Sequence, residues 1–138
     1  MATMILTPVL ALICWTLLVW CLMYVRRIPA MKTAGIDPDD ARHPGSLDIL
    51  PSRARAAADN YNHLHEQPTV FYALAFYTAL AGNGTELTLS LAWAYVVLRV
   101  LHSVVQTTVN KVMLRFSLFA LSSLVLIALA IINVLALG

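Results

Sequence analysis

Three long runs of apolar residues constrain this chain of 138 residues more than any other feature of its sequence. They cover about residues 4–25, 87–108 and 114–137, and each has roughly the 20 residues that a helix needs to cross a bilayer core. Hydrophobic residues make up 60% of the chain and charged residues only 12%. A soluble protein of this length could not bury so much apolar surface, so we expect an integral membrane protein. The net charge of +2 is too small for a nucleic-acid-binding protein.

A fourth crossing is predicted over residues 62–81, although its uninterrupted apolar part, 70–81, is too short to span alone. The turn at residues 82–84, Gly-Asn-Gly, sets the far end of this helix. Counting back about 20 residues at 1.5 Å each places the near end close to Asn62. The expected helix therefore carries several polar side chains into the membrane, where they should face protein or a wet cavity. These are Asn62, His63, His65, Glu66 and Gln67.

Basic residues are concentrated between the first and second predicted spans, in a loop over about residues 26–58. The N-terminus and the 82–86 turn contain no Lys or Arg. Because cytoplasmic loops carry the excess of basic residues, we expect the 26–58 loop in the cytoplasm and both termini outside. The predicted fold is a single all-α membrane domain over residues 1–138, a bundle of four transmembrane helices.

Hydrogen-bonding side chains form a stripe on the third predicted span, at i, i+3, i+7 and i+11: Arg99, His102, Gln106 and Asn110. Arg99 lies about 18 Å from the outer end of that span. A guanidinium at this depth costs at least about 2.5 kcal/mol unless it is paired. Glu66 is the partner that we expect for it.

The second predicted span carries a matching stripe, formed by Arg55, Asp59, Asn62 and Glu66, with His63 one residue away from it. Two such stripes on neighbouring helices indicate a shared polar pocket. The alternative is a purely structural ion pair between Glu66 and Arg99, with the other side chains satisfied inside the bundle.

Two further residue types bear on the chemistry of this pocket. Arg115, which opens the fourth span, could stabilise an anion or a thiolate, or could be an interfacial arginine that reaches toward water. His63 and His65 are two residues apart and cannot share a helix face, so no metal site is expected.

Several short motifs resemble those of the MAPEG family, the membrane-associated proteins in eicosanoid and glutathione metabolism. The resemblance covers essentially the whole chain. It rests on residues 62–68, Asn-His-Leu-His-Glu-Gln-Pro, on residues 99–102, Arg-Val-Leu-His, and on Asn110 and Arg115-Phe116. The variant from Glu66 to Tyr72 looks most like a bacterial branch, which implies a bacterial inner membrane. The resemblance also implies a homotrimer of four-helix subunits.

The resemblance implies a glutathione-dependent transferase or peroxidase that acts on hydrophobic electrophiles or lipid hydroperoxides from the bilayer. Glutathione, as co-substrate, would lie between adjacent subunits at the cytoplasmic end. The resemblance implies that Glu66 binds the amino group of glutathione and that Arg115 is the catalytic residue that stabilises the glutathione thiolate. The remaining members of the expected glutathione-binding set are Asn62, His63, Arg99, His102, Gln106 and Asn110.

Three positions differ from the pattern of the enzymatic members. Asp59 stands where those members carry an arginine, His63 where they carry an asparagine, and Gln106 at a position that is often tyrosine. A carboxylate at position 59 would repel a carboxylate of glutathione. These differences favour an alternative in which the chain is a non-catalytic membrane protein of the same fold, binding lipid or docking onto a partner membrane complex.

Overall fold

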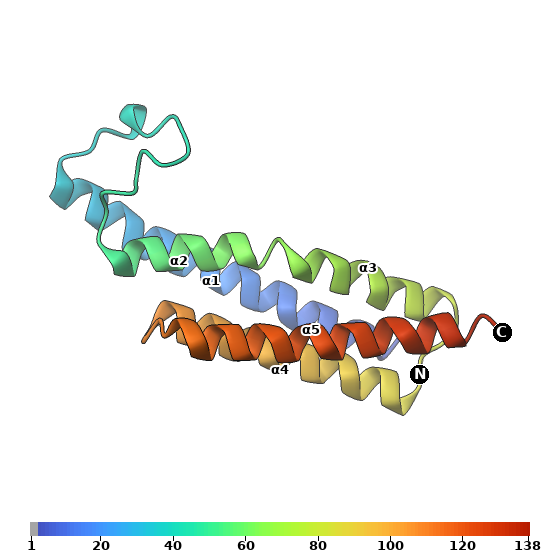
Figure 1. Cartoon of the computed structure of the whole chain (residues 1–138). Helices are drawn as coiled ribbons and strands as arrows, with labels where there is room; N and C mark the ends of the chain where they lie inside the picture. The colour runs from blue at the N-terminus through green and yellow to red at the C-terminus, as the bar shows by residue number, and fades with distance from the viewer. Residues whose placement is uncertain (1–2) are drawn as a thin grey trace.

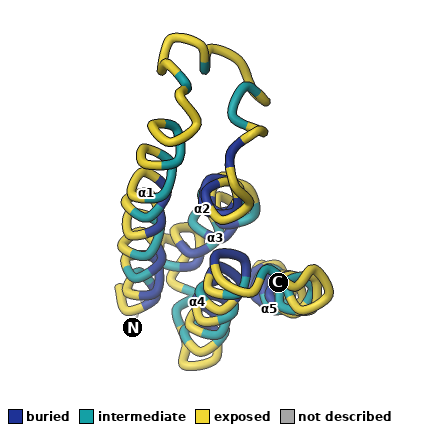
Figure 2. The backbone as a smooth tube through the Cα atoms, turned by 90° about the vertical axis from the view of Figure 1, so that its left-hand side faces the viewer, coloured by how far each residue is buried: buried dark blue, intermediate teal, exposed yellow. Residues whose placement is uncertain are grey.

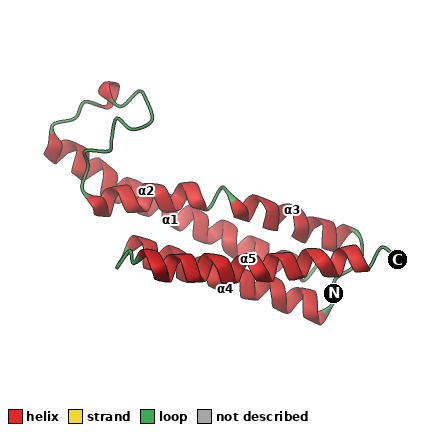
Figure 3. Cartoon of the chain, viewed as in Figure 1, coloured by secondary structure: helices red, strands yellow, loops and turns green. Residues whose placement is uncertain are grey.

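Helices account for nearly all of the regular structure in the computed structural model, which describes residues 3–138 and contains no strand in that range (Figure 3). The start of α1 and the C-terminus lie at one end of the bundle, and the segment 35–51 lies at the other (Figure 1). The elements, in chain order, are α1 (Leu6–Ala34), a 3-10 turn η1 (Pro38–Asp40), α2 (Ser52–His63), α3 (Gln67–Leu80), α4 (Glu86–Thr107) and α5 (Val112–Leu135).

Three of these helices, α1, α4 and α5, are long and apolar enough to cross a membrane. They agree with the three long apolar runs of the sequence, and the bounds of α4 and α5 fall within two residues of those predicted. Helix α4 begins at a capping box, in which the Thr85 hydroxyl accepts from the Thr88 backbone N–H and the Thr88 hydroxyl accepts from that of Thr85. Local hydrogen bonding thus fixes the start of α4.

Helix α1 extends nine residues beyond the predicted end of the first span, so the prediction of a loop from residue 26 is wrong. Arg26 lies on this extension and donates through Nη1 to the backbone carbonyls of Thr107 (2.9 Å) and Arg53 (3.3 Å). These bonds hold the end of α1 against the C-terminus of α4 and the start of α2. The helix ends at Gly35, whose φ of +67° suits the left-handed position after a helix terminus.

The predicted continuous helix over residues 62–81 is also wrong, because the chain breaks between α2 and α3 at residues 64–66 (Figure 1). Pro68 gives the physical reason. It has no backbone N–H to donate to the carbonyl of residue 64, and its ring would clash with that carbonyl in a continuous helix. A proline is tolerated in the first turn, and Pro68 occupies that place in α3.

The main apolar core is formed where the helices face one another, and it includes Leu12 of α1, Phe71 of α3, Tyr95 of α4 and Leu126 of α5. The rings of Phe71 and Tyr95 stack with centroids 4.5 Å apart. The outward faces of α1, α4 and α5 are largely exposed (Figure 2) and rich in large apolar side chains. Apolar inside and outside alike, these helices have the composition of membrane spans.

Candidate functional site

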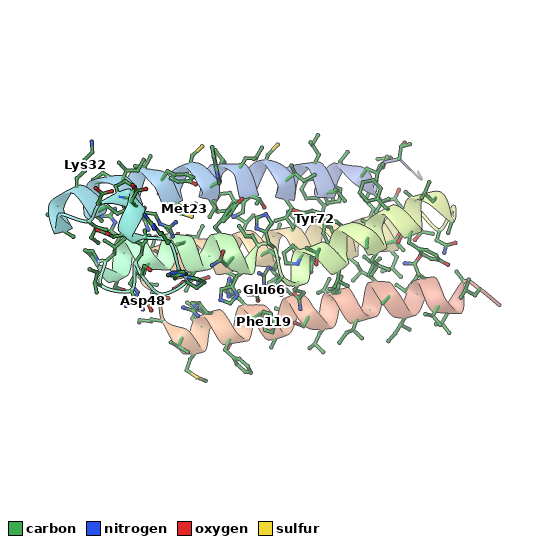
Figure 4. The ribbon with its side chains drawn as sticks, turned by 90° about the horizontal axis from the view of Figure 1, so that it is seen from above. Met23, Lys32, Asp48, Glu66, Tyr72 and Phe119 are labelled. Carbon is green, nitrogen blue, oxygen red and sulfur yellow. The ribbon has the colours of Figure 1, made fainter. Side chains whose placement is uncertain are left out.

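A pocket of about 260 Å³ lies where the break between α2 and α3 faces α4 and α5. Glu66 and Phe119 lie close together in the space between this break and α5 (Figure 4). Four polar side chains that the sequence predicted for one site line this pocket together. Its lining is His63, Glu66, His102, Val112, Arg115, Phe116 and Phe119.

The break between the helices positions His63 and Glu66. His63 is the last residue of α2, and Glu66 immediately precedes α3. Their side chains meet, with 3.2 Å between His63 Nδ1 and Glu66 Oε2. The Glu66 carboxylate thus contacts an imidazole and not the guanidinium of Arg99, so the predicted pair between Glu66 and Arg99 is wrong. The turn at the break directs the carboxylate toward the histidine instead.

Arg99 lies beneath the pocket as a positioning residue and is only 1% exposed. Its Nη2 donates to the backbone carbonyl of His63 at 3.3 Å, and its guanidinium lies 5.9 Å from the ring centroid of Phe119. Within residues 3–138, Nε and Nη1 of Arg99 are buried without a hydrogen-bond partner. Arg99 therefore ties α4 to the end of α2 at the His63 carbonyl, which also accepts from the Glu66 backbone N–H at 3.3 Å.

His102 brings α4 to the same pocket. Its ring meets that of His63 edge to face, with 6.0 Å between the centroids. The side chain is 5% exposed, and its Nδ1 is buried without a partner in the described part of the chain. His102 is thus a second imidazole at the pocket wall, as the stripe on the third span predicted.

Arg115 enters the pocket from the first turn of α5. Its Nη1 donates to the side-chain oxygen of Asn110, and its Nε is buried without a partner among residues 3–138. Asn110 itself has a φ of +49°, a left-handed conformation that asparagine tolerates better than most residues. The short connection between α4 and α5 therefore sets the direction of the Arg115 guanidinium through Asn110.

Four predicted site residues do not line this pocket. Arg99 and Asn110 contact residues that do, whereas Gln106 and Asn62 have other surroundings. The Gln106 side-chain oxygen accepts a hydrogen bond from Asn60 Nδ2 at 2.9 Å, and both residues are at most 1% exposed. Asn62 is exposed and lines a different cavity, together with Arg55 and Asp59. The stripe predicted on the second span is therefore split between two cavities. Arg55, Asp59 and Asn62 on α2 line the one beside the 35–51 segment, and Glu66 lines the one beside α5.

Sequence reasoning missed part of the pocket wall and its support. Val112 and Phe119 supply apolar wall from α5, and their spacing of seven residues, with Arg115 between them, is a helical signal that could have indicated them. Gln67 links three helices, since its Oε1 accepts from Tyr95 and its Nε2 donates to Ser123. In the described residues, no three His, Cys, Asp or Glu side chains gather as a metal site requires.

The comparison with protein families decides the identity of the chain. A family model described as MAPEG family matches residues 5–135. The chain belongs to the MAPEG family. No curated protein and no solved structure matches it. Family membership and the three apolar helices together make this MAPEG protein an integral membrane protein, in a family associated with glutathione and eicosanoid metabolism.

Proposed function

We propose that this MAPEG protein is a glutathione-dependent transferase or peroxidase acting on hydrophobic electrophiles or lipid hydroperoxides from the bilayer. The observation that carries the proposal is the pocket itself, which places Arg115 beside Glu66 and His63 against an apolar wall. A cation at a partly desolvated site favours the ionised form of a thiol, which is the nucleophile.

The described residues offer partners for two groups of glutathione as co-substrate, its thiolate and its amino group. Arg115 has one buried nitrogen, Nε, without a partner and can stabilise a thiolate. The Glu66 carboxylate uses one oxygen for His63, which leaves the other for the glutathione amino group. Phe116 and Phe119 provide an apolar surface for the second substrate. Asp59 lines another cavity and so does not oppose a carboxylate at this pocket.

The assembly that we propose is a homotrimer with four crossings in each subunit. Helix α3 has 14 residues, about 21 Å, and the end of α2 would complete the fourth crossing. The exposed apolar faces of α4 and α5 would then contact neighbouring subunits or lipid. The basic residues at one end of the bundle lie on the last part of α1 and the start of α2, and they favour a cytoplasmic position for that end with both termini outside. The resemblance to bacterial members implies that the membrane is a bacterial inner membrane.

Turnover by the purified protein tests the enzymatic proposal. Detergent-purified protein is assayed with glutathione and either a halogenated aromatic compound or a lipid hydroperoxide. We expect turnover that falls at least about 100-fold in Arg115→Ala, the usual scale for losing a charge-stabilising group. Lys111→Ala is the matched control, because Lys111 is a basic residue one turn away that does not line the pocket. Absence of turnover with both substrate classes would count against an enzyme.

A non-catalytic lipid-binding role is the second candidate, and a different observation favours it. An apolar groove of about 340 Å³ runs between α1 and α4, lined in part by Trp15 and Trp93. Such a groove suits an acyl chain. A stoichiometric lipid retained in native mass spectrometry, with binding and trimer unchanged in Glu66→Gln, would support this role over the enzymatic one.

A further inference from the structure

The hydrogen bond between His63 and Glu66 fixes which nitrogen of the imidazole is free. An ionised carboxylate only accepts hydrogen bonds, so the proton of the contact at 3.2 Å belongs to His63 Nδ1. The other ring nitrogen, Nε2, is then left with its lone pair. A histidine oriented in this way by a carboxylate is the usual arrangement of a general base.

The groups around His63 come from every element at this pocket. Glu66 holds its ring, and the His102 ring of α4 meets it at 6.0 Å. Arg99 contacts its backbone carbonyl from α4, and Arg115 shares the pocket from α5. His63 therefore shares the pocket with one carboxylate, a second imidazole and the cation that would hold the thiolate.

His65 provides the contrast within the same turn. Its Nδ1 contacts the backbone carbonyl of Tyr61 at 2.8 Å, and its ring packs on the Tyr61 ring with centroids 4.5 Å apart. It does not line the pocket. The two histidines thus differ in position and partner, although both lie beside the helix break.

We propose that His63, held by Glu66, carries protons between thiol and substrate and so equips this site for reducing hydroperoxides. This inference rests on the proposed glutathione chemistry. The S–H proton of glutathione passes to His63 Nε2, and the thiolate is stabilised by Arg115. As the sulfur–oxygen bond forms, the peroxide O–O bond breaks. The departing alkoxide takes the proton from His63 and leaves as an alcohol.

To complete the reaction, the oxidised sulfur of the first glutathione needs only a second glutathione. The sulfenic acid formed in the first step reacts with the second thiol to give the disulfide and one water molecule. Conjugation to an aryl halide differs in one respect, because its leaving halide needs no proton. A proton carried on His63 therefore speeds hydroperoxide reduction in a way that halide displacement does not share.

The test compares two substrates in His63→Asn, with His65→Asn as the matched control. Both are assayed at about pH 7, where the thiol still carries the proton that His63 would accept. We expect kcat/KM for a lipid hydroperoxide to fall about 100-fold or more in His63→Asn. We expect kcat/KM for a halogenated aromatic substrate to fall at least about 10-fold less, because that reaction loses the base but needs no proton returned to its leaving group. His65→Asn should leave both reactions near the wild-type values.

Chemical rescue separates proton transfer from a structural effect. Added imidazole should restore much of the hydroperoxide activity of His63→Ala, because the His63 side chain is 38% exposed and the pocket is open there. Equal losses for both substrates, or no rescue, would overturn the role of His63. In that case wild-type turnover with either substrate still supports the proposed function. A wild-type protein without a glutathione-dependent reaction of either kind would overturn both proposals.

Discussion

Replacing Asn60 and Gln106 by alanine, singly and together, tests whether this buried pair is structural. Asn60 Nδ2 donates to the Gln106 side-chain oxygen at 2.9 Å, and the two residues are 0% and 1% exposed. Each single replacement removes the bond and leaves a buried polar group without a partner, which costs about 1–3 kcal/mol. The double replacement removes both groups. It should therefore cost about 1–3 kcal/mol less than the sum of the single costs.

Equilibrium unfolding of the detergent-solubilised protein measures this coupling in the free energy of unfolding. The control cycle pairs Gln106→Ala with Asn133→Ala, because Asn133 hydrogen-bonds to Thr78 and Asn83 and shares no partner with Gln106. That control should be additive within about 0.5 kcal/mol. If Asn60 and Gln106 were also additive, or if Gln106→Ala abolished glutathione binding at unchanged stability, Gln106 would be a ligand rather than a structural partner.

Two further predictions concern the connections on either side of the pocket. Asn110→Ala should be less stable in unfolding experiments than Asn110→Gly by about 1 kcal/mol, because only glycine accepts a positive φ without strain. Both variants should weaken thiolate formation by releasing Arg115, and unchanged thiolate formation would show that Asn110 does not direct it. Pro68→Ala should let α2 and α3 join, which hydrogen exchange would report as new protection of the amides of residues 67 and 68, because those of residues 64–66 already donate to backbone carbonyls. Persistently fast exchange there would mean that tertiary contacts, rather than the proline, cause the break.

Hydropathy was sufficient to predict the three long helices, because a helix that crosses a bilayer core needs a run of about 20 apolar residues and such runs are rare outside membrane spans. Hydropathy did not predict that α1 continues past residue 25. Arg26 holds that extension by reaching the carbonyls of Thr107 and Arg53, contacts that are distant in sequence, and the helix ends at Gly35. Pro68 indicated the break before α3. The prediction of one continuous helix instead followed from counting about 20 residues back from the turn at 82–84.

Periodicity put Glu66 and His102 on two facing stripes, and both line one pocket, but it misplaced Gln106. The stripe on α4 meets α2 along its whole length, with Arg99 and His102 at His63 and Gln106 further on at Asn60. The pocket to α5 opens beside only the first part of that contact. Spacing along one helix does not encode how the helices cross, so it could not assign Gln106 to Asn60. For the same reason the pairing of Glu66 with His63 rather than Arg99 required the geometry of the break.

The position of Arg115 was the easiest part of the site to anticipate, because it opens α5 immediately after a tight connection. Its position left two interpretations open, an anion-stabilising cation or an interfacial arginine, and the family resemblance favoured the first. The structure adds two independent features: the hydrogen bond that Arg115 donates to Asn110, which directs the guanidinium, and a buried Nε of Arg115 without a partner in the described chain. Both are what a group that stabilises a buried anion requires.

Ultraviolet difference titration with glutathione tests the central claim most directly, because thiolate absorbance reports ionisation at the site without any choice of second substrate. The wild-type protein and Lys111→Ala should both show saturable thiolate absorbance at neutral pH. Arg115→Ala should lose it, since the cation that stabilises the thiolate is gone. Absence of thiolate and of binding in the wild-type protein at millimolar glutathione, or an unchanged signal in Arg115→Ala, would contradict a thiol site at this pocket.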